Sequence, residues 1–134
     1  MKLITRNTDY ALRAICFIAR NQKRAVSATE LVEKLKIPRS FLRSLLQVLN
    51  RKKVLKSSRG QGGGFLLARS PEKIFLVDLI AIFQGPLKLN ECFLKKLSCP
   101  NKKTCGLRKK IQSIEAYVVK ELNSITIASL LEGK

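Results

Sequence analysis

Three cysteines lie within fourteen residues of one another, at Cys92, Cys99 and Cys105. Thiolate sulfurs are strong ligands for transition metals, so three of them this close together can supply most of a metal's ligands. The chain is expected to stay in a reducing compartment, where cysteines bind metals or do redox chemistry more often than they form structural disulfides. The sequence therefore predicts a metal centre in this segment.

The spacing of the three cysteines separates the candidate metals. Structural zinc sites usually pair cysteines about two to four residues apart, whereas the gaps here are six and five residues. An iron–sulfur cluster is held in a wider cage of thiolates and tolerates such gaps. The chain has no histidine, so a fourth ligand has to be an oxygen donor, the distant Cys16, a small molecule or a residue of a partner subunit. The spacing favours an iron–sulfur cluster and leaves the fourth ligand open.

Lysines surround the same cysteines, and their positive charge favours the reactive thiolate over the thiol. They are Lys95, Lys96, Lys102 and Lys103. This arrangement also suits a thiol switch that works without a cluster, which is the main alternative. Three free buried cysteines would be unusual in so polar a segment. Cys16 differs from them, because it lies among apolar residues and is expected to be a small core residue.

The net charge of +18 and the isoelectric point near 10.3 favour binding to a polyanion. The charge is also segregated, because residues 34–69, here called the basic segment, contain no acid. Its basic residues are Lys34, Lys36, Arg39, Arg43, Arg51, Lys52, Lys53, Lys56, Arg59 and Arg69. Nucleic acid is the expected partner. A basic RNA-binding or architectural protein with a structural metal is the alternative from a different class.

The totals fit one compact domain with an extension, since the chain has 134 residues and is 46% apolar. It has no apolar run of about 18 residues and does not begin like a secretory signal, so a cytoplasmic location without membrane contact is expected. Catalysis is not expected, because the chain has no histidine for a triad. The acids Glu30 and Glu33 lie close together, but on a helix whose capping accounts for them.

The first half of the chain has the pattern of a helix-turn-helix. Apolar residues at helical spacing predict helices over residues 8–21, 27–36 and 38–49. Asn7 or Thr8 is the expected cap of the first of these helices, and the second opens on a capping box. In a helix-turn-helix, the N-terminal residues of the second helix face base edges in the major groove. Those residues are Arg39, Ser40 and Arg43.

A glycine-rich hairpin is expected directly after the helix-turn-helix, which makes it a wing. Strand-like runs cover residues 54–58 and 65–68, and the tip between them begins with Arg59, Gly60 and Gln61. Glycines permit close backbone approach, and a narrow minor groove attracts arginine. The tip is therefore predicted to enter the minor groove. The loop lacks the residues of a phosphate-binding loop for nucleotides.

Two further helices are expected, over residues 76–84 and 106–124. The first should pack under the wing. The second carries apolar residues at steps of four and three, which is the pattern of a coiled-coil seam. This α-helical seam consists of Leu107, Ile111, Ile114, Val118, Leu122 and Ile125. It predicts a homodimer, the alternative being that the seam packs only within its own chain.

Taken together, these motifs make the chain resemble the winged-helix iron–sulfur regulators typified by IscR, NsrR and RirA. The resemblance covers nearly the whole chain. Its motifs are Thr-Asp-Tyr-Ala-Leu-Arg-Ala at residues 8–14, Arg-Gly-Gln-Gly-Gly-Gly-Phe at 59–65, the three cysteines after Gly-Pro-Leu at 85–87, and Thr-Ile-Ala-Ser-Leu-Leu at 126–131.

The resemblance implies a mainly α (α+β) fold, with a winged helix-turn-helix domain, a two-stranded wing and a long C-terminal dimerisation helix. The expected division is a DNA-binding domain over residues 1–86, a cluster-binding loop over 87–105, and a dimerisation helix with a C-terminal segment over 106–134. The implied partner is double-stranded DNA with a palindromic operator. The implied function is regulation of transcription, as a repressor, under the control of a cluster that senses nitric oxide, redox state or iron.

The family also suggests the fourth ligand. In its nitric-oxide-sensing members, an aspartate of the Thr-Asp motif reaches across the dimer to complete a 4Fe-4S cluster, and that residue is Asp9 here. IscR-like members use a histidine shortly after the third cysteine, which this chain lacks. A 4Fe-4S cluster is therefore favoured, and a 2Fe-2S cluster is the other option. IscR-like proteins also have a glutamate where this chain has Arg43, so their operator preference does not transfer.

Overall fold

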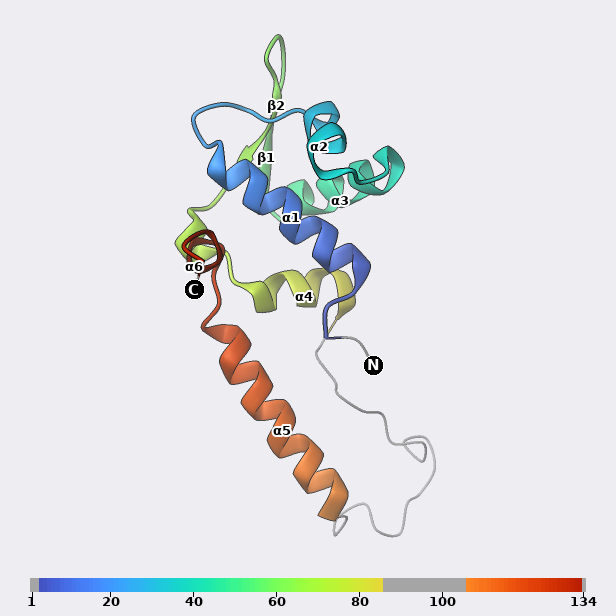
Figure 1. Cartoon of the computed structure of the whole chain (residues 1–134), viewed down its shortest axis with the longest axis vertical. Coiled ribbons are helices and arrows are strands. Elements are labelled where there is room, and N and C mark those ends of the chain that lie inside the picture. Colours follow the sequence, from blue (N-terminus) through green and yellow to red (C-terminus); the bar gives the residue numbers. More distant parts are fainter. Residues whose placement is uncertain (1–2, 86–105, 134) are drawn as a thin grey trace.

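The computed structural model describes residues 3–85 and 106–133. Helix α1, Arg6–Arg20, runs through the middle of a head built from the winged-helix elements, and the long helix α5, Gly106–Asn123, projects from the base of that head (Figure 1). The tip of the wing and the N-terminal end of α5 lie at opposite ends of the molecule (Figure 1). Among the described residues, no helix is long and apolar enough to span a bilayer.

Helix α1 forms because its apolar residues recur on one face, where Ala11, Ile15 and Ile18 are fully buried. The helix begins earlier than predicted. Its N-cap is Thr5, with an extended backbone and a hydroxyl that accepts a hydrogen bond from the Thr8 N–H. The expected cap at Asn7 or Thr8 is therefore wrong, because several cap-forming residues follow one another and the sequence does not choose between them.

The helix-turn-helix consists of α2, Ala28–Leu35, and α3, Arg39–Arg51. Lys36 ends α2 in the left-handed conformation, with φ 58°. The Ser27 hydroxyl caps α2 by accepting from the Glu30 N–H at 3.1 Å. The second bond of the predicted capping box is not formed, because the Glu30 carboxylate pairs with Arg24 at 2.6 Å. That ion pair lowers the pKa of Glu30.

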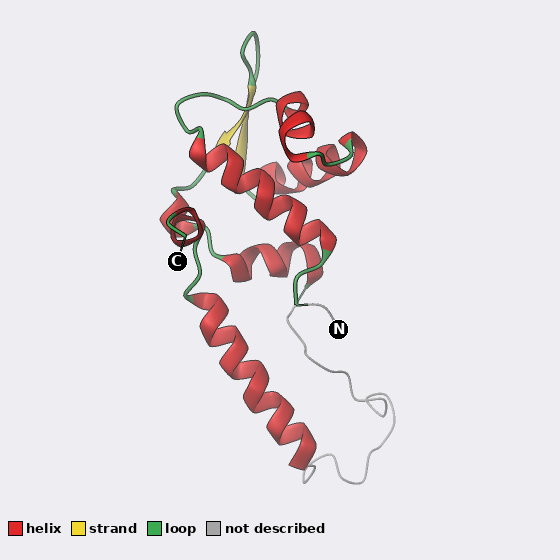
Figure 2. Cartoon of the chain, viewed as in Figure 1, coloured by secondary structure: helices red, strands yellow, loops and turns green. Residues whose placement is uncertain are grey.

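The wing is an antiparallel hairpin of β1, Leu55–Ser58, and β2, Gly64–Leu67, in which Leu55 pairs with Leu67. These are the only strands in the described residues, which are otherwise mainly helical (Figure 2). A β-bridge between Val26 and Phe65 fastens the hairpin to the segment before α2. A Cβ atom at residue 64 would collide with the Val26 carbonyl oxygen, so this close approach requires glycine.

Two of the helices that follow the wing pack against α1. A short 3-10 helix, η1 at Pro71–Lys73, precedes α4, Leu76–Gln84, which packs against α1 and α5. Helix α4 packs mainly against α1 and α5 rather than against the hairpin, which corrects the expectation that it packs under the wing. Helix α6, Ile127–Leu131, packs against α1 and η1, and Ile127 is fully buried in the main core. The winged-helix fold with a long C-terminal helix is confirmed.

Candidate nucleic-acid interface

The first turns of α3 present the predicted base-reading residues to solvent. Arg39, Ser40 and Arg43 are all exposed, whereas the opposite face of α3 is buried in the core through Leu42, Leu45, Leu46 and Leu49. The Arg39 Nη1 donates to the Thr29 hydroxyl at 3.3 Å, which joins the two helices of the motif. The N-terminal end of α3 is thus free to enter a major groove.

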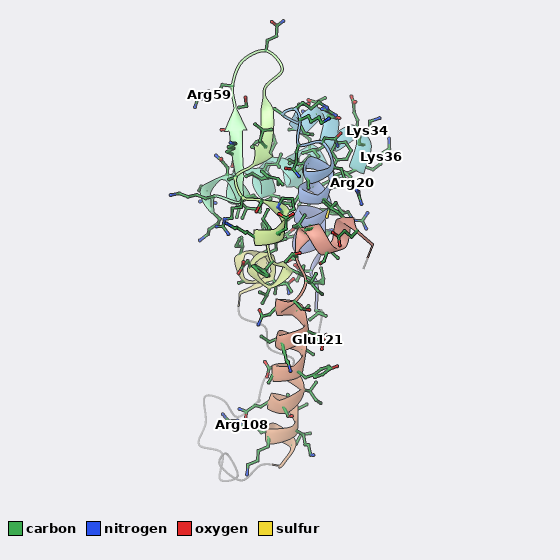
Figure 3. The ribbon with its side chains drawn as sticks, turned by 90° about the vertical axis from the view of Figure 1, so that its left-hand side faces the viewer. Arg20, Lys34, Lys36, Arg59, Arg108 and Glu121 are labelled. Atoms are coloured by element: carbon green, nitrogen blue, oxygen red, sulfur yellow. The ribbon has the colours of Figure 1, made fainter. Side chains whose placement is uncertain are left out.

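The tip of the wing is exposed as well. Arg59, Gly60 and Gln61 all face solvent, and Arg59 extends away from the hairpin (Figure 3). Gly60 and Gly62 adopt φ values of 96° and 75°, which favour glycine. The Gly63 N–H closes the turn by donating to the Gly60 carbonyl oxygen at 2.9 Å. The glycine pattern therefore makes a narrow tip with an arginine at its base.

No acid in the part of the chain that the structure describes pairs with a residue of the basic segment. The ion pairs Arg13–Asp9 and Arg24–Glu30 both lie outside it. Lys34 of α2 and Lys36, which caps that helix, lie at the same end of the molecule as the wing (Figure 3). Uncompensated positive charge attracts the DNA backbone and releases its counterions on binding.

Asp9 lies on the surface of α1. Its Oδ2 accepts from the Arg13 Nε at 2.9 Å, and its side chain is 41% exposed. Within the described ranges, 3–85 and 106–133, no three cysteine or acidic side chains come together as a metal site. Cys92, Cys99 and Cys105 lie outside the described residues, so their proximity to Asp9 stays a prediction. An exposed ion pair contributes at most about 1 kcal/mol, so the carboxylate is easily released for another ligand.

Cys16 is half-buried and packs against the main core, as expected of a small apolar residue. Burial raises the pKa of its thiol. A raised pKa disfavours the thiolate form that a metal ligand requires. This environment therefore weakens the case for Cys16 as the fourth ligand.

The seam of α5 is divided into two parts. Its C-terminal part packs within the chain, where Leu122 is 6% exposed and forms a small core with Leu76 and Ile80 of α4. Val118 and Ile125 pack around that core. The alternative that the seam packs on its own domain therefore holds for this part.

The N-terminal part of the seam lacks a partner in the described residues. Leu107 is 68% exposed and Ile114 is 51% exposed, while Ile111 is half-buried. Tyr117, one turn beyond Ile114, is 64% exposed and extends this apolar strip. Tyr117 was not among the predicted seam residues, although its spacing of three from Ile114 places the two residues on one face.

A partly buried hydrogen-bond network joins the start of α1 to the end of α4, and no pattern in the sequence indicates it. The Gln84 Oε1 accepts from the Thr8 hydroxyl at 2.7 Å and from the Thr5 N–H at 2.9 Å. The Gln84 Nε2 donates to the Leu3 carbonyl oxygen at 3.1 Å. Thr8 is fully buried and immediately precedes Asp9. The network thus fixes the helix end that carries the candidate ligand.

Comparison with known proteins identifies the family. A family model described as "Rrf2: Iron-dependent Transcriptional regulator" matches residues 4–133. The chain belongs to the Rrf2 family. Rrf2 relatives include a protein of Aquifex aeolicus named as an HTH-type transcriptional regulator, which is 32% identical over 91% of this chain and 86% of its own. The transcriptional regulator NsrR of Bacillus licheniformis is 27% identical over 98% of this chain and 92% of its own.

Solved structures share the fold of this chain. CymR of B. subtilis, described as its global cysteine regulator, superposes with a TM-score of 0.84 at 24% identity and covers 100% of this chain and 99% of its own. The structure of T. potens IscR has a TM-score of 0.72 at 28% identity, with coverage of 99% and 88%. The resemblance to winged-helix regulators is confirmed, and the chain is an Rrf2-family transcriptional regulator.

Proposed function

We propose that this chain is a homodimeric repressor whose binding to palindromic promoter DNA is controlled by an iron–sulfur cluster. The proposal of DNA binding rests on one observation. The first turns of α3 and the wing tip are exposed and contain no acidic residue. Arg39, Ser40 and Arg43 read base edges in the major groove. Arg59, with Gly60 and Gln61, enters the adjacent minor groove.

The cluster is held by Cys92, Cys99 and Cys105 with Asp9 of the partner subunit, and a 4Fe-4S form fits best. The chemistry of this donor set suits iron, because three thiolates and a carboxylate are available and histidine is absent from the chain. Asp9 fits the role of fourth ligand because it is accessible and held only by a surface ion pair. A bound cluster supplies iron that reacts with nitric oxide or oxygen and is lost when iron is scarce.

Control of DNA binding follows from the geometry of a dimer. The exposed strip of α5, at Leu107, Ile114 and Tyr117, buries itself against the same strip of a second copy. Two recognition helices must then match half-sites about 34 Å apart, or a multiple of that distance. When Asp9 is released, α1 of one subunit loses its link to the cysteine segment of the other, residues 87–105. The separation of the two α3 helices changes and the affinity for DNA changes with it.

The DNA-binding part is tested with Arg59→Ala. This change removes a cation from an exposed tip, so it should weaken operator binding and reduce the steepness of the salt dependence by about 0.9 for each phosphate that is no longer neutralised. The dimer should persist in sedimentation velocity, because Arg59 is remote from α5 (Figure 3). Unchanged affinity and salt dependence would remove the wing from the interface.

The cofactor is tested by purification without air from iron-fed cells. A brown protein with charge-transfer absorption and acid-labile sulfide supports the cluster. A colourless protein whose DNA binding responds to reversible thiol oxidation would instead establish the alternative, a cluster-free thiol switch. Lysines beside the cysteines favour that alternative, because they stabilise thiolates.

A further inference from the structure

An arginine and two aromatic residues meet where α1 and α3 begin. The Arg6 guanidinium carbon lies 4.8 Å from the centre of the Phe41 ring. Tyr10 contacts the same ring edge-on, with ring centres 6.5 Å apart and planes at 73°. Phe41 is 39% exposed, although it is a large apolar residue. The ring thus serves as a platform for Arg6 at the surface, beside the base-reading residues of α3.

The contribution of Arg6 to folding does not explain its position. Arg6 is exposed and forms no ion pair within the described part of the chain, whereas Arg13 and Arg24 are each paired with an acid. It is the first residue of α1, and the helix dipole disfavours a cation in the first turn. A stacked arginine keeps its N–H edges free, and that fork of donors matches the oxygens of a phosphate.

We propose that Arg6, held in place by Phe41, binds a DNA phosphate at the edge of the major groove that α3 enters. Phe41 directly follows Ser40 in the first turn of α3, so a cation stacked on its ring lies next to the base-reading surface. The sugar–phosphate strands line both edges of the groove. Arg6 then contacts a strand from α1, whereas the wing contacts DNA from the hairpin. This proposal rests on the proposed DNA binding and is independent of the cluster.

The test compares Arg6→Gln with the unaltered full chain. Binding to a mixed-sequence DNA duplex is measured by fluorescence anisotropy from about 50 to 200 mM salt. Arg6→Gln should reduce the slope of log affinity against log salt by about 0.9 for each bound subunit, since one fewer phosphate is neutralised. Arg6→Lys should keep most of the slope, because it keeps the charge. An unchanged slope in Arg6→Gln would overturn the proposal.

The role of Phe41 is tested with a double-mutant cycle. If the ring positions Arg6, then Arg6→Gln should cost less affinity in a Phe41→Leu background than in the natural chain. Equal costs in both backgrounds would show that the ring does not position Arg6. Circular dichroism melting should show that each variant is folded, since both positions are exposed.

A matched control separates the Arg6 contact from general charge. Lys120→Ala removes the same charge from an exposed site on α5, away from the recognition helix, and should leave the slope unchanged. A loss of slope in Lys120→Ala equal to that in Arg6→Gln would show that only net charge matters, and would overturn the proposal.

If Arg59→Ala weakens binding and Arg6→Gln does not, the proposed function stands and only the Arg6 contact fails. If the natural chain binds no duplex, both fail.

Discussion

Asp9, the candidate ligand, forms a surface ion pair with Arg13. This weak pair leaves the Asp9 carboxylate able to exchange Arg13 for another partner. The pair is exposed and spans one turn of α1, so removing it costs the fold at most about 1 kcal/mol. The residue pattern alone assigns Asp9 an ordinary role at a helix N-terminus, and only the family resemblance marks it as a ligand. Its position on an accessible face of α1 is compatible with both roles.

The Asp9→Ala variant should separate these two roles. It should speed loss of the charge-transfer absorption in air while changing the melting temperature little, because the carboxylate makes only a surface contact. Arg13→Ala is the matched control, since it breaks the same ion pair and keeps the carboxylate, and its cluster should decay at the natural rate. A cluster equally stable in both variants would return Asp9 to a purely structural role.

The Thr8–Gln84 hydrogen bond is a second test at the scale of single residues. Thr8→Val keeps the shape of a fully buried side chain but removes the donor to the Gln84 Oε1. The free energy of unfolding should fall by about 1 kcal/mol, the usual net value of one buried hydrogen bond. Urea denaturation measures this, with exposed Ser44→Ala as a control that should not lower the free energy of unfolding, because alanine favours the helix. No difference between the two variants would show that the network contributes nothing to stability.

Most elements were predictable because their signals are local. The helices of the head have apolar residues at helical spacing, and the glycines between β1 and β2 mark the hairpin directly. Two features depend on contacts distant in sequence and were missed. Thr5 caps α1, and its N–H also donates to Gln84, which is distant in sequence. The placement of α4 depends on its packing against α1 and α5.

Helix α5 shows the same limit on prediction within a single element. Its seam reads as one continuous coiled-coil strip, yet Leu122 is buried on α4 while Ile114 is exposed. Periodicity identifies an apolar face but does not say which neighbour covers it. The three-dimensional structure buries the C-terminal part of the strip within the chain and leaves Leu107 and Ile114 of its N-terminal part exposed.

This division predicts different outcomes for two substitutions in α5. Ile114→Lys should dissociate the proposed dimer without lowering the melting temperature of the monomer, because it places a charge in the exposed part of the strip. Leu122→Ala should instead destabilise the fold by about 2–5 kcal/mol, as expected for a buried leucine. Sedimentation velocity and thermal melting distinguish these effects. A dimer that tolerates Ile114→Lys would place the association surface elsewhere.

The molecule has two ends for which functions are proposed. The wing and the first turns of α3 lie at one end, and the N-terminal end of α5 lies at the other (Figure 1). Helix α1 packs against α3 and β2 on the side that is proposed to bind DNA, and against α4 on the other side. A change at the start of α1 can therefore reach the DNA-binding face through direct packing.

The state of the cluster is proposed to set the affinity for DNA. The direct measurement is the affinity for a selected operator duplex of one anaerobic sample, before and after its cluster is destroyed with nitric oxide. We predict at least about a tenfold difference, or 1.4 kcal/mol, with the protein dimeric in both states. Equal affinity in the two states would contradict control by the cluster.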